Sequence, residues 1–116
     1  MTAVLAMLAL MMPAPNMEQK EGKVYVPKCD SRCHKRRVVR PYNAKLNRMA
    51  YCESTGRWWI STGNGFYGGL QFDLRTWYSV GGRGYPHQNS SLEQKYRAVR
   101  LIRQRGYSPW PRCGSA

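Results

Sequence analysis

Acidic residues are scarce in this sequence. Six Asp and Glu stand against nineteen Lys and Arg among 116 residues, which gives a formal net charge of +13 at pH 7. Such a charge bears on partners rather than on the fold, and it leaves nucleic acid, anionic lipid and anionic cell-wall polymers as candidates. The aromatic residues are interleaved with Gly and Asn rather than with Lys and Arg, which argues against a dedicated nucleic-acid-binding module.

Long apolar runs are also missing. The apolar stretch at residues 1–12 has the length of the apolar region of a signal peptide and is too short to span a bilayer. No positive residues precede it, and Pro15 directly after Ala14 makes a poor cleavage site. We therefore expect a signal-like segment over residues 1–17, either an export signal or an uncleaved apolar start, and no transmembrane span.

The rest of the chain divides into two parts. Residues 18–41 are dense in Lys and Arg with few apolar residues, so we predict a solvated basic linker or arm there. Residues 42–116 then form one folded domain, and a core of roughly 75 residues usually needs a staple. Cys52 and Cys113 bracket the aromatic part and are the candidates for such a staple, which would stabilise the fold by roughly 4 kcal/mol, with two buried thiols as the alternative.

The other two cysteines, Cys29 and Cys33, lie in the basic segment and are followed by His34. Two thiols and an imidazole can begin a zinc site, but no second pair of ligands follows at a suitable spacing. We expect a local disulfide or two free thiols there, and no metal site. Four cysteines in so short a chain favour an oxidising compartment.

Helical periodicity begins after the basic segment. Asn43 can cap a first helix, Gly56 can end it, and one face carries Leu46, Met49 and Ala50. Asp73 can cap a second helix. Ser90 and Glu93 have capping-box spacing before a third helix, which Gly106 ends and whose apolar face carries Leu92, Tyr96, Val99 and Ile102. Between the first two helices, Gly63-Asn64-Gly65 predicts a β-hairpin turn flanked by residues 60–62 and 66–67.

Five of the six acidic residues have ordinary roles in this scheme. Glu18, Glu21 and Asp30 belong to the basic segment as solvent-facing charges, and Asp73 and Glu93 belong to helix starts. Glu53 remains. It lies four residues after Met49, at the end of the apolar helical face, and precedes a run rich in Trp, Tyr, Gly and Asn, which are residue types that line sugar-binding clefts.

Glu53 therefore indicates glycoside cleavage. A carboxyl group at a partly dry edge has its charged form disfavoured, which raises its pKa toward the range of a general acid. A glycosidase with two carboxylates would need Asp73 as the second group, and the capping role of Asp73 competes with that. A single-carboxyl mechanism fits better, and it requires no metal or organic cofactor.

A family resemblance rests on these same residues. The stretch from Cys52 to Trp77, with Gly81-Gly82, Gln94 and Trp110-Pro111-Arg112-Cys113-Gly114, resembles the catalytic domain of the resuscitation-promoting factors, which are secreted muralytic proteins with phage-encoded relatives. The family pattern begins Cys-Glu-Ser-Gly-Gly-Asn-Trp, runs through Thr-Gly-Asn-Gly-Tyr-Tyr-Gly-Gly to Gln-Phe and Thr-Trp, and ends Trp-Pro-x-Cys. The match covers about residues 43–114.

The resemblance implies an α+β, mostly helical, small lysozyme-like domain with a short β-hairpin and one disulfide, between Cys52 and Cys113. It implies cleavage of the peptidoglycan glycan strand, as a lytic transglycosylase or a muramidase, by a monomer that is secreted or associated with the cell wall. A phage virion or a phage-encoded lysin is the alternative location. Anionic wall polymers and another wall hydrolase are further candidate partners, whereas nucleic acid is not expected.

Site residues carry over by position in this pattern. Glu53 matches the catalytic acid, and the substrate-binding candidates are Gln71, Thr76, Trp58 and Tyr67. We expect core packing for Trp77 and Trp110. The alternative function is a catalytically weak module that binds the cell wall through the same groove.

The sequence departs from the family pattern at four positions. Thr55 replaces Gly, Arg57 replaces Asn, Trp59 replaces a small residue and Ser61 replaces Asn. Arg57 is close to Glu53 in sequence, and a guanidinium close to it in space would lower the pKa of the acid. Thr55 and Trp59 are expected to narrow or reshape the groove.

Overall fold

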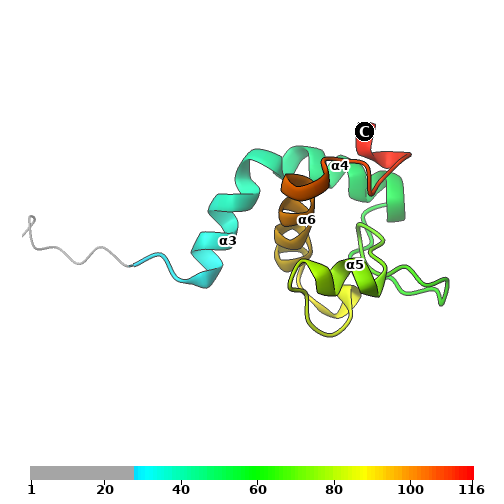
Figure 1. Ribbon diagram of the computed structural model, residues 1–116, viewed down its shortest axis with the longest axis horizontal. Coiled ribbons are helices and arrows are strands. Elements are labelled where there is room, and N and C mark those ends of the chain that lie inside the picture. The colour runs from blue at the N-terminus through cyan, green and yellow to red at the C-terminus, as the bar shows by residue number, and fades with distance from the viewer. Residues whose placement is uncertain (1–27) are drawn as a thin grey trace, which may run out of the picture.

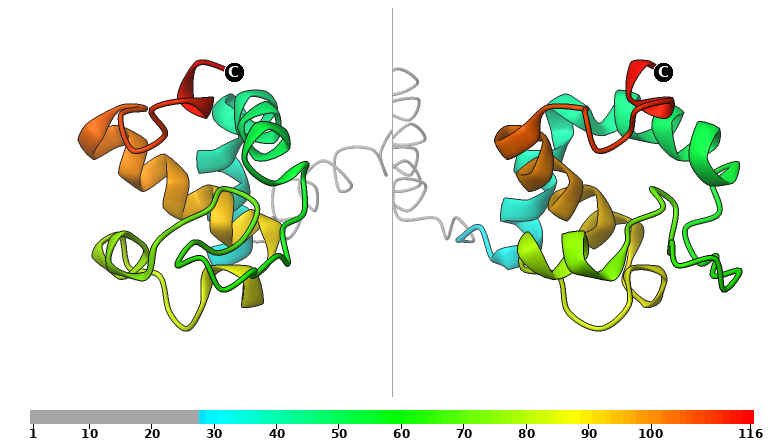
Figure 2. Two further views of the ribbon diagram at one scale, coloured as in Figure 1. Left: turned by 90° about the vertical axis from the view of Figure 1, so that its right-hand side faces the viewer. Right: turned by 45° about the vertical axis from the view of Figure 1, so that its right-hand side comes forward.

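The computed structural model describes residues 28–116 of the chain, and Figure 1 shows a bundle of helices joined by long loops. The helices are α3 (Ser31–Val39), α4 (Asn43–Ser54), α5 (Leu74–Ser79) and α6 (Ser91–Arg105), with single-turn 3-10 helices η1 (Arg40–Tyr42), η2 (Pro86–Gln88) and η3 (Cys113–Ser115). Helix α3 lies at one side of α6, and the loop from α4 to α5 lies at the opposite side (Figures 1 and 2).

The core forms where the apolar faces of α4 and α6 meet the aromatic residues of the loops. The predicted α4 face is fully buried, and Val99 and Ile102 of α6 are buried as predicted. Phe72 packs edge-on against both Trp77 and Trp110, with ring centroids 5.2 and 6.0 Å apart, so the two tryptophans are core residues, as expected. This mostly helical architecture confirms the predicted fold class.

The helix ends follow the predicted chemistry in most cases. Asp73 accepts a hydrogen bond from the backbone N–H of Thr76 at 2.8 Å and thereby caps α5. Ser90 accepts from the N–H of Glu93 at 3.1 Å and caps α6, which ends at Gly106. These side chains satisfy backbone donors that have no partner inside the helix.

The predicted cap at Asn43 is wrong. Helix α4 continues directly from η1, so Asn43 is already its first helical residue, and its side-chain oxygen accepts from Lys95 Nζ at 2.8 Å instead. The helix ends at Ser54, and its C-cap is Thr55 rather than Gly56, with a φ of 58° that places Thr55 in the left-handed region. This region favours glycine, which is the family residue at that position.

The loop between α4 and α5 contains less β-structure than the predicted hairpin. Within the described residues, its pairing consists of isolated bridges between Ser61 and Tyr67 and between Tyr67 and Phe72. The buried side chain of Gln94 supports the loop from α6, accepting from Gly69 N–H and donating to the carbonyl oxygen of Trp58, both at 2.9 Å. Tertiary hydrogen bonds therefore supplement the few backbone hydrogen bonds that the loop makes within itself.

Helix α3 differs from the expectation of a solvated arm. Asp30 is exposed, as expected of a solvent-facing charge, and it also caps the helix by accepting from Cys33 N–H at 2.8 Å. Lys35 forms an ion pair with Glu93 of α6, and Val39 is 3% exposed. Lys35 and Val39 are four residues apart and so share one helical face, which packs on α6, while the arginines of this segment are exposed.

Two disulfides occur in the described part of the chain, the one that the resemblance implies and the local one that was an alternative to two free thiols. One joins Cys52 to Cys113 across 61 residues, and the other joins Cys29 to Cys33 at the start of α3. No helix between residues 28 and 116 combines the length and hydropathy needed to cross a membrane. The signal-like segment predicted for residues 1–17 lies outside the described residues.

Candidate active site

Glu53 lies in the last turn of α4, at the wall of a cavity of about 420 Å³. Its chain neighbour Cys52 is bonded to Cys113, and Arg112 directly precedes Cys113. The disulfide therefore brings Glu53 and Arg112 to the same cavity from two distant parts of the chain. The cavity is lined by Glu53, Phe66, Gln71, Pro109, Trp110, Pro111 and Arg112.

The electrostatic environment of Glu53 favours its neutral form. Burial raises the pKa of the Glu53 carboxyl above its ordinary value of 4.5, and the positive charge of Arg112 offsets part of this rise. Within residues 28–116, the carboxyl group forms no ion pair, since both salt bridges there belong to Glu93. Glu53 is therefore a half-buried carboxyl group that retains a proton more readily than a free glutamate.

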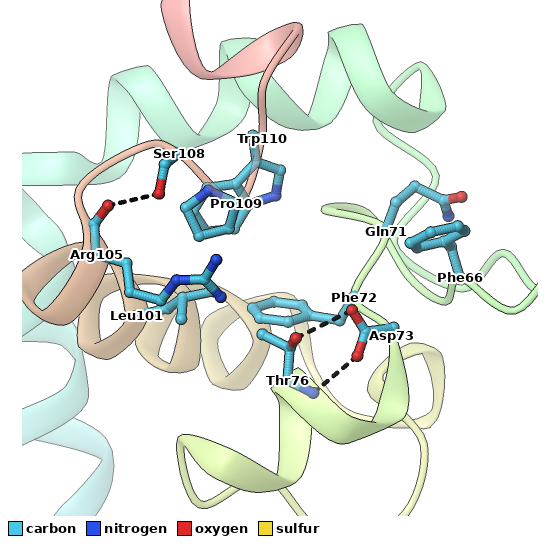
Figure 3. Close-up of a pocket in the computed structure, with 10 residues that line it drawn as sticks. All are labelled: Phe66, Gln71, Phe72, Asp73, Thr76, Leu101, Arg105, Ser108, Pro109 and Trp110. Atoms are coloured by element: carbon cyan, nitrogen blue, oxygen red, sulfur yellow. Dashed lines mark hydrogen bonds between the residues drawn. The ribbon is translucent and has the colours of Figure 1, made fainter.

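A second cavity of about 230 Å³ adjoins the first (Figure 3). The two share four lining residues, so they form one groove, with Glu53 toward one end and Thr76 toward the other. In Figure 3, the Arg105 guanidinium reaches toward the space between Pro109 and Thr76. The shared residues are Phe66, Gln71, Pro109 and Trp110.

Asp73 lines the second cavity, but both of its carboxylate oxygens are engaged. One accepts from the backbone N–H of Thr76 at 2.8 Å, and the other accepts from the Thr76 hydroxyl at 3.0 Å (Figure 3). Asp73 therefore holds the start of α5 and orients Thr76 toward the groove. This arrangement leaves Glu53 as the carboxyl group of the groove that has no structural partner among the described residues.

Gln71 sits between the two cavities in an unusual backbone conformation. Its φ of 54° is in the left-handed region, and its side-chain Nε2 donates to the carbonyl oxygen of Gly68 at 2.9 Å. The neighbouring Leu70 carbonyl accepts from Trp110 Nε1 at 2.9 Å, which ties the turn to the C-terminal segment. Non-glycine residues in this region cluster at functional sites because the surrounding structure must hold them there.

Trp58 and Tyr67 do not line the groove. The Trp58 ring packs over Gly69, where a Cβ atom would overlap it, and Lys95 lies over the ring at 5.3 Å from its centroid. Tyr67 stacks on His87 with ring centroids 5.5 Å apart. Both therefore shape the loop from behind, while Gln71 and Thr76 face the groove with Glu53.

The cation that acts on Glu53 is not Arg57, which the sequence had pointed to. Arg57 Nε donates to the carbonyl oxygen of Ser54 at 2.8 Å, and Arg112 is the residue whose charge acts on Glu53. Sequence reasoning also missed the groove roles of Phe66, Arg105 and Pro109. For Arg112 a signal existed, because a disulfide between Cys52 and Cys113 necessarily brings their chain neighbours together.

The alternative of a zinc site at Cys29 and Cys33 is not supported. Their sulfur atoms are joined to each other and provide no thiolate ligands. Over residues 28–116, no three His, Cys, Asp or Glu side chains gather in an arrangement that would hold a metal ion.

Comparison with known proteins shows which family the chain matches and which residues carry the match. A family model described as a transglycosylase-like domain matches residues 40–113, which include Glu53 and the whole groove. The chain is similar to the resuscitation-promoting factor Rpf of Micrococcus luteus, at 57% identity over 67 residues, 58% of this chain and 30% of that protein.

Two proteins of Mycobacterium tuberculosis are also similar. The resuscitation-promoting factor RpfE is 44% identical over 73 residues, 63% of this chain and 42% of that protein. The resuscitation-promoting factor RpfC is 47% identical over 68 residues, 59% of this chain and 49% of that protein. The chain thus spans less than half the length of each of these relatives.

Proposed function

The chain belongs to the transglycosylase-like domain family, and we propose that it is an enzyme that cleaves the glycan strand of peptidoglycan. The predicted resemblance to the catalytic domain of the resuscitation-promoting factors is confirmed by relatives at 44–57% identity. The observation that carries the proposed chemistry is Glu53, a half-buried carboxyl group of raised pKa in the groove.

In the proposed reaction, Glu53 donates its proton to the glycosidic oxygen as the bond from that oxygen to the sugar C1 breaks. The electron pair of the bond leaves with the oxygen, and the ring carries oxocarbenium character. The C6 hydroxyl of an N-acetylmuramic acid ring then attacks C1, and the Glu53 carboxylate accepts its proton. The products are a free hydroxyl end and a 1,6-anhydro end, and attack by water would give a reducing end instead.

Two groove residues serve as substrate contacts in this proposal. The amide of Gln71 already donates to Gly68, which leaves its carbonyl oxygen as an acceptor for a sugar hydroxyl. The Thr76 hydroxyl donates to Asp73 and keeps lone pairs for the same purpose. Trp58 and Tyr67 act indirectly, by holding the loop that presents Gln71.

The test is digestion of purified peptidoglycan, with the product ends identified by mass spectrometry. We expect soluble fragments with anhydro ends from the parent protein and far fewer from Glu53→Gln, which removes the proton donor and preserves the side-chain volume. Fragments with reducing ends would support hydrolysis instead. If the folded parent protein binds the wall and releases no fragments, the alternative of a binding module without turnover is correct.

We further propose that the protein works outside the cytoplasm, secreted or attached to the cell wall. Two disulfides within 89 described residues support this, because disulfides persist in oxidising compartments. The relatives named above are bacterial proteins, so they lend no support to a phage location.

The proposed second partner is an anionic wall polymer, which binds to α3. Arg32, Arg36 and Arg40 follow one another at four-residue spacing, so they form a row along one side of α3 that ends at the first residue of η1. Arg32 lines a cavity of about 300 Å³ between α3 and the start of α6, and Arg36 and Arg40 line another of about 340 Å³ together with Asn43 and Leu92. Within the described residues these arginines form no salt bridge, so their charge is available to an anionic polymer.

The arginine row can be tested by changing all three residues to Gln. We expect weaker wall binding at low salt, with the difference shrinking as salt screens the attraction. The matched control changes the exposed residues Arg75, Arg83 and Arg103, which line none of these cavities, to Gln. Equal loss of binding in both variants would show a general charge effect and contradict the row as a site.

A further inference from the structure

Arg112 is placed beside the acid by covalent geometry. The disulfide joins the residue before Glu53 to the residue after Arg112 and so keeps the two backbones close, and both side chains line one cavity. Arg112 is exposed and has no acidic partner among the described residues. In the family pattern Trp-Pro-x-Cys, Arg112 occupies the unrestricted position.

We propose that Arg112 is a subsite for a carboxylate group carried by the substrate, next to the bond that is cleaved. This inference rests on the proposed glycan cleavage and names the charge of its substrate. A guanidinium is always protonated and offers paired N–H donors that match the two oxygens of a carboxylate. Muramic acid carries a carboxylate on its lactyl group, and a stem peptide attached there carries carboxylates of its own, so both are candidate sources.

The surroundings favour an anion at this point of the groove. Arg105 lines the adjoining cavity, and Glu53 holds a proton in the active form, so neither opposes a negative charge. Asp73 is the other acidic residue of the groove, and it faces two hydrogen-bond donors of Thr76. The net field along the groove is therefore positive where the substrate would lie.

A carboxylate bound at this subsite changes the pKa of Glu53 as well as the affinity for the substrate. The free Arg112 charge lowers the pKa of Glu53, against the larger effect of burial. A bound carboxylate neutralises that charge, so the pKa of Glu53 rises and more of the enzyme is protonated at neutral pH. By linkage, protonation of Glu53 also strengthens binding of the anionic substrate. An uncharged substrate brings no such gain.

The test compares matched substrates that differ in one charge. The substrates are glycan fragments that contain muramic acid, either with a free lactyl carboxylate or with that group amidated. Cleavage of each substrate is measured with the parent protein and with Arg112→Gln. For the free carboxylate we expect kcat/KM to fall about tenfold or more, the loss typical of a charge-assisted hydrogen bond. For the amidated fragment we expect little loss, and the alkaline limb of its pH profile should move to higher pH.

Controls separate the subsite from general charge and from the proposed function. Arg103→Gln removes an exposed α6 arginine outside both cavities and should change kcat/KM for neither substrate. Fragments that carry a stem peptide with free carboxylates distinguish the lactyl carboxylate from the peptide carboxylates, because the lactyl group is blocked in them. Equal losses for charged and amidated fragments would overturn the subsite.

A binding measurement covers the case in which the parent protein cleaves no fragment, which would contradict the proposed function alone. With Glu53→Gln as the background, calorimetry should show tighter binding of the free-carboxylate fragment than of the amidated one. Adding Arg112→Gln should remove that preference. No preference in the first protein, or its survival in the second, would contradict the subsite.

Discussion

Glu53 and Glu93 are both half-buried glutamates on helices, and their surroundings drive their pKa values in opposite directions. Burial raises the pKa of Glu53, and one nearby guanidinium offsets only part of the rise. Burial would also raise the pKa of Glu93, but hydrogen bonds from Lys35 and Arg97 outweigh it and lower the pKa. The comparison separates a carboxyl group available for chemistry from one committed to holding α3 against α6.

Helix position acts in the same sense as the pairing. Glu53 lies in the last turn of α4, at the negative end of its dipole, and Glu93 lies in the first turn of α6, at the positive end. A negative charge is disfavoured at the first place and favoured at the second. Burial alone therefore does not identify a proton donor, and partners and position decide.

The largest expected effect is on cleavage. Glu53→Gln should reduce the rate of wall cleavage by about 10²–10⁴-fold, the usual contribution of a general acid, whereas Glu93→Gln should retain most of the rate. Release of soluble fragments from purified wall measures both. Similar losses in the two folded variants would show that the two glutamates do not have separate roles.

The same two variants should shift stability in opposite directions. At neutral pH, Glu93→Gln should lower the free energy of unfolding by roughly 1.5–3 kcal/mol, because glutamine is uncharged and has one acceptor oxygen for the two donors, Lys35 and Arg97. The stabilisation by Glu93 is present above its unfolded pKa and is lost as pH falls through its depressed folded pKa. Glu53→Gln should stabilise slightly at neutral pH, because the folded state disfavours the Glu53 charge. Urea unfolding at several pH values would contradict this if both changes had the same sign.

The disulfide beside Glu53 should also show its effect in stability. Cys52→Ala and Cys113→Ala should each lower the free energy of unfolding by up to roughly 4 kcal/mol, and the double variant by little more, because either change opens the same loop. Cys29→Ala should cost less, since the loop it opens spans only four residues. Clearly additive losses for Cys52 and Cys113 would mean that the two residues act independently.

A smaller effect is expected at the helix end next to Glu53. Thr55 has a left-handed φ of 58°, so Thr55→Gly should stabilise the fold by about 0.5–1 kcal/mol, strain relief exceeding the added chain entropy. Thr62→Gly, at an exposed loop position outside the left-handed region, is the control and should not stabilise. Thermal unfolding measures the stability of both variants. Equal losses of stability would show that the backbone at Thr55, next to Glu53, is not strained.

The sequence allowed prediction of the parts of the fold that depend on local pattern. The buried faces of α4 and α6, the caps at Asp73 and Ser90, and the core tryptophans followed from periodicity and from the family motif. Helix α3 was missed because its many cations mask the two residues, Lys35 and Val39, that face α6. The partner of Lys35 is Glu93, 58 residues away, and no local pattern connects the two.

The candidate site divides in the same way. Glu53, Gln71 and Thr76 were predicted and line one groove, whereas Arg105 and Phe66 enter it only through tertiary packing. Trp58 and Tyr67 match the family motif but lie behind the loop, because a motif records which residues are required and not which way they face.

The most direct test of the account is a pH titration of the Glu53 and Glu93 carboxyl carbons by NMR, with the signals assigned through Glu53→Gln and Glu93→Gln. The account predicts that the pKa of Glu53 lies above 4.5 and that of Glu93 below it. Equal values, or the reverse order, would contradict the central claim that Glu53 is the carboxyl group held ready to donate a proton.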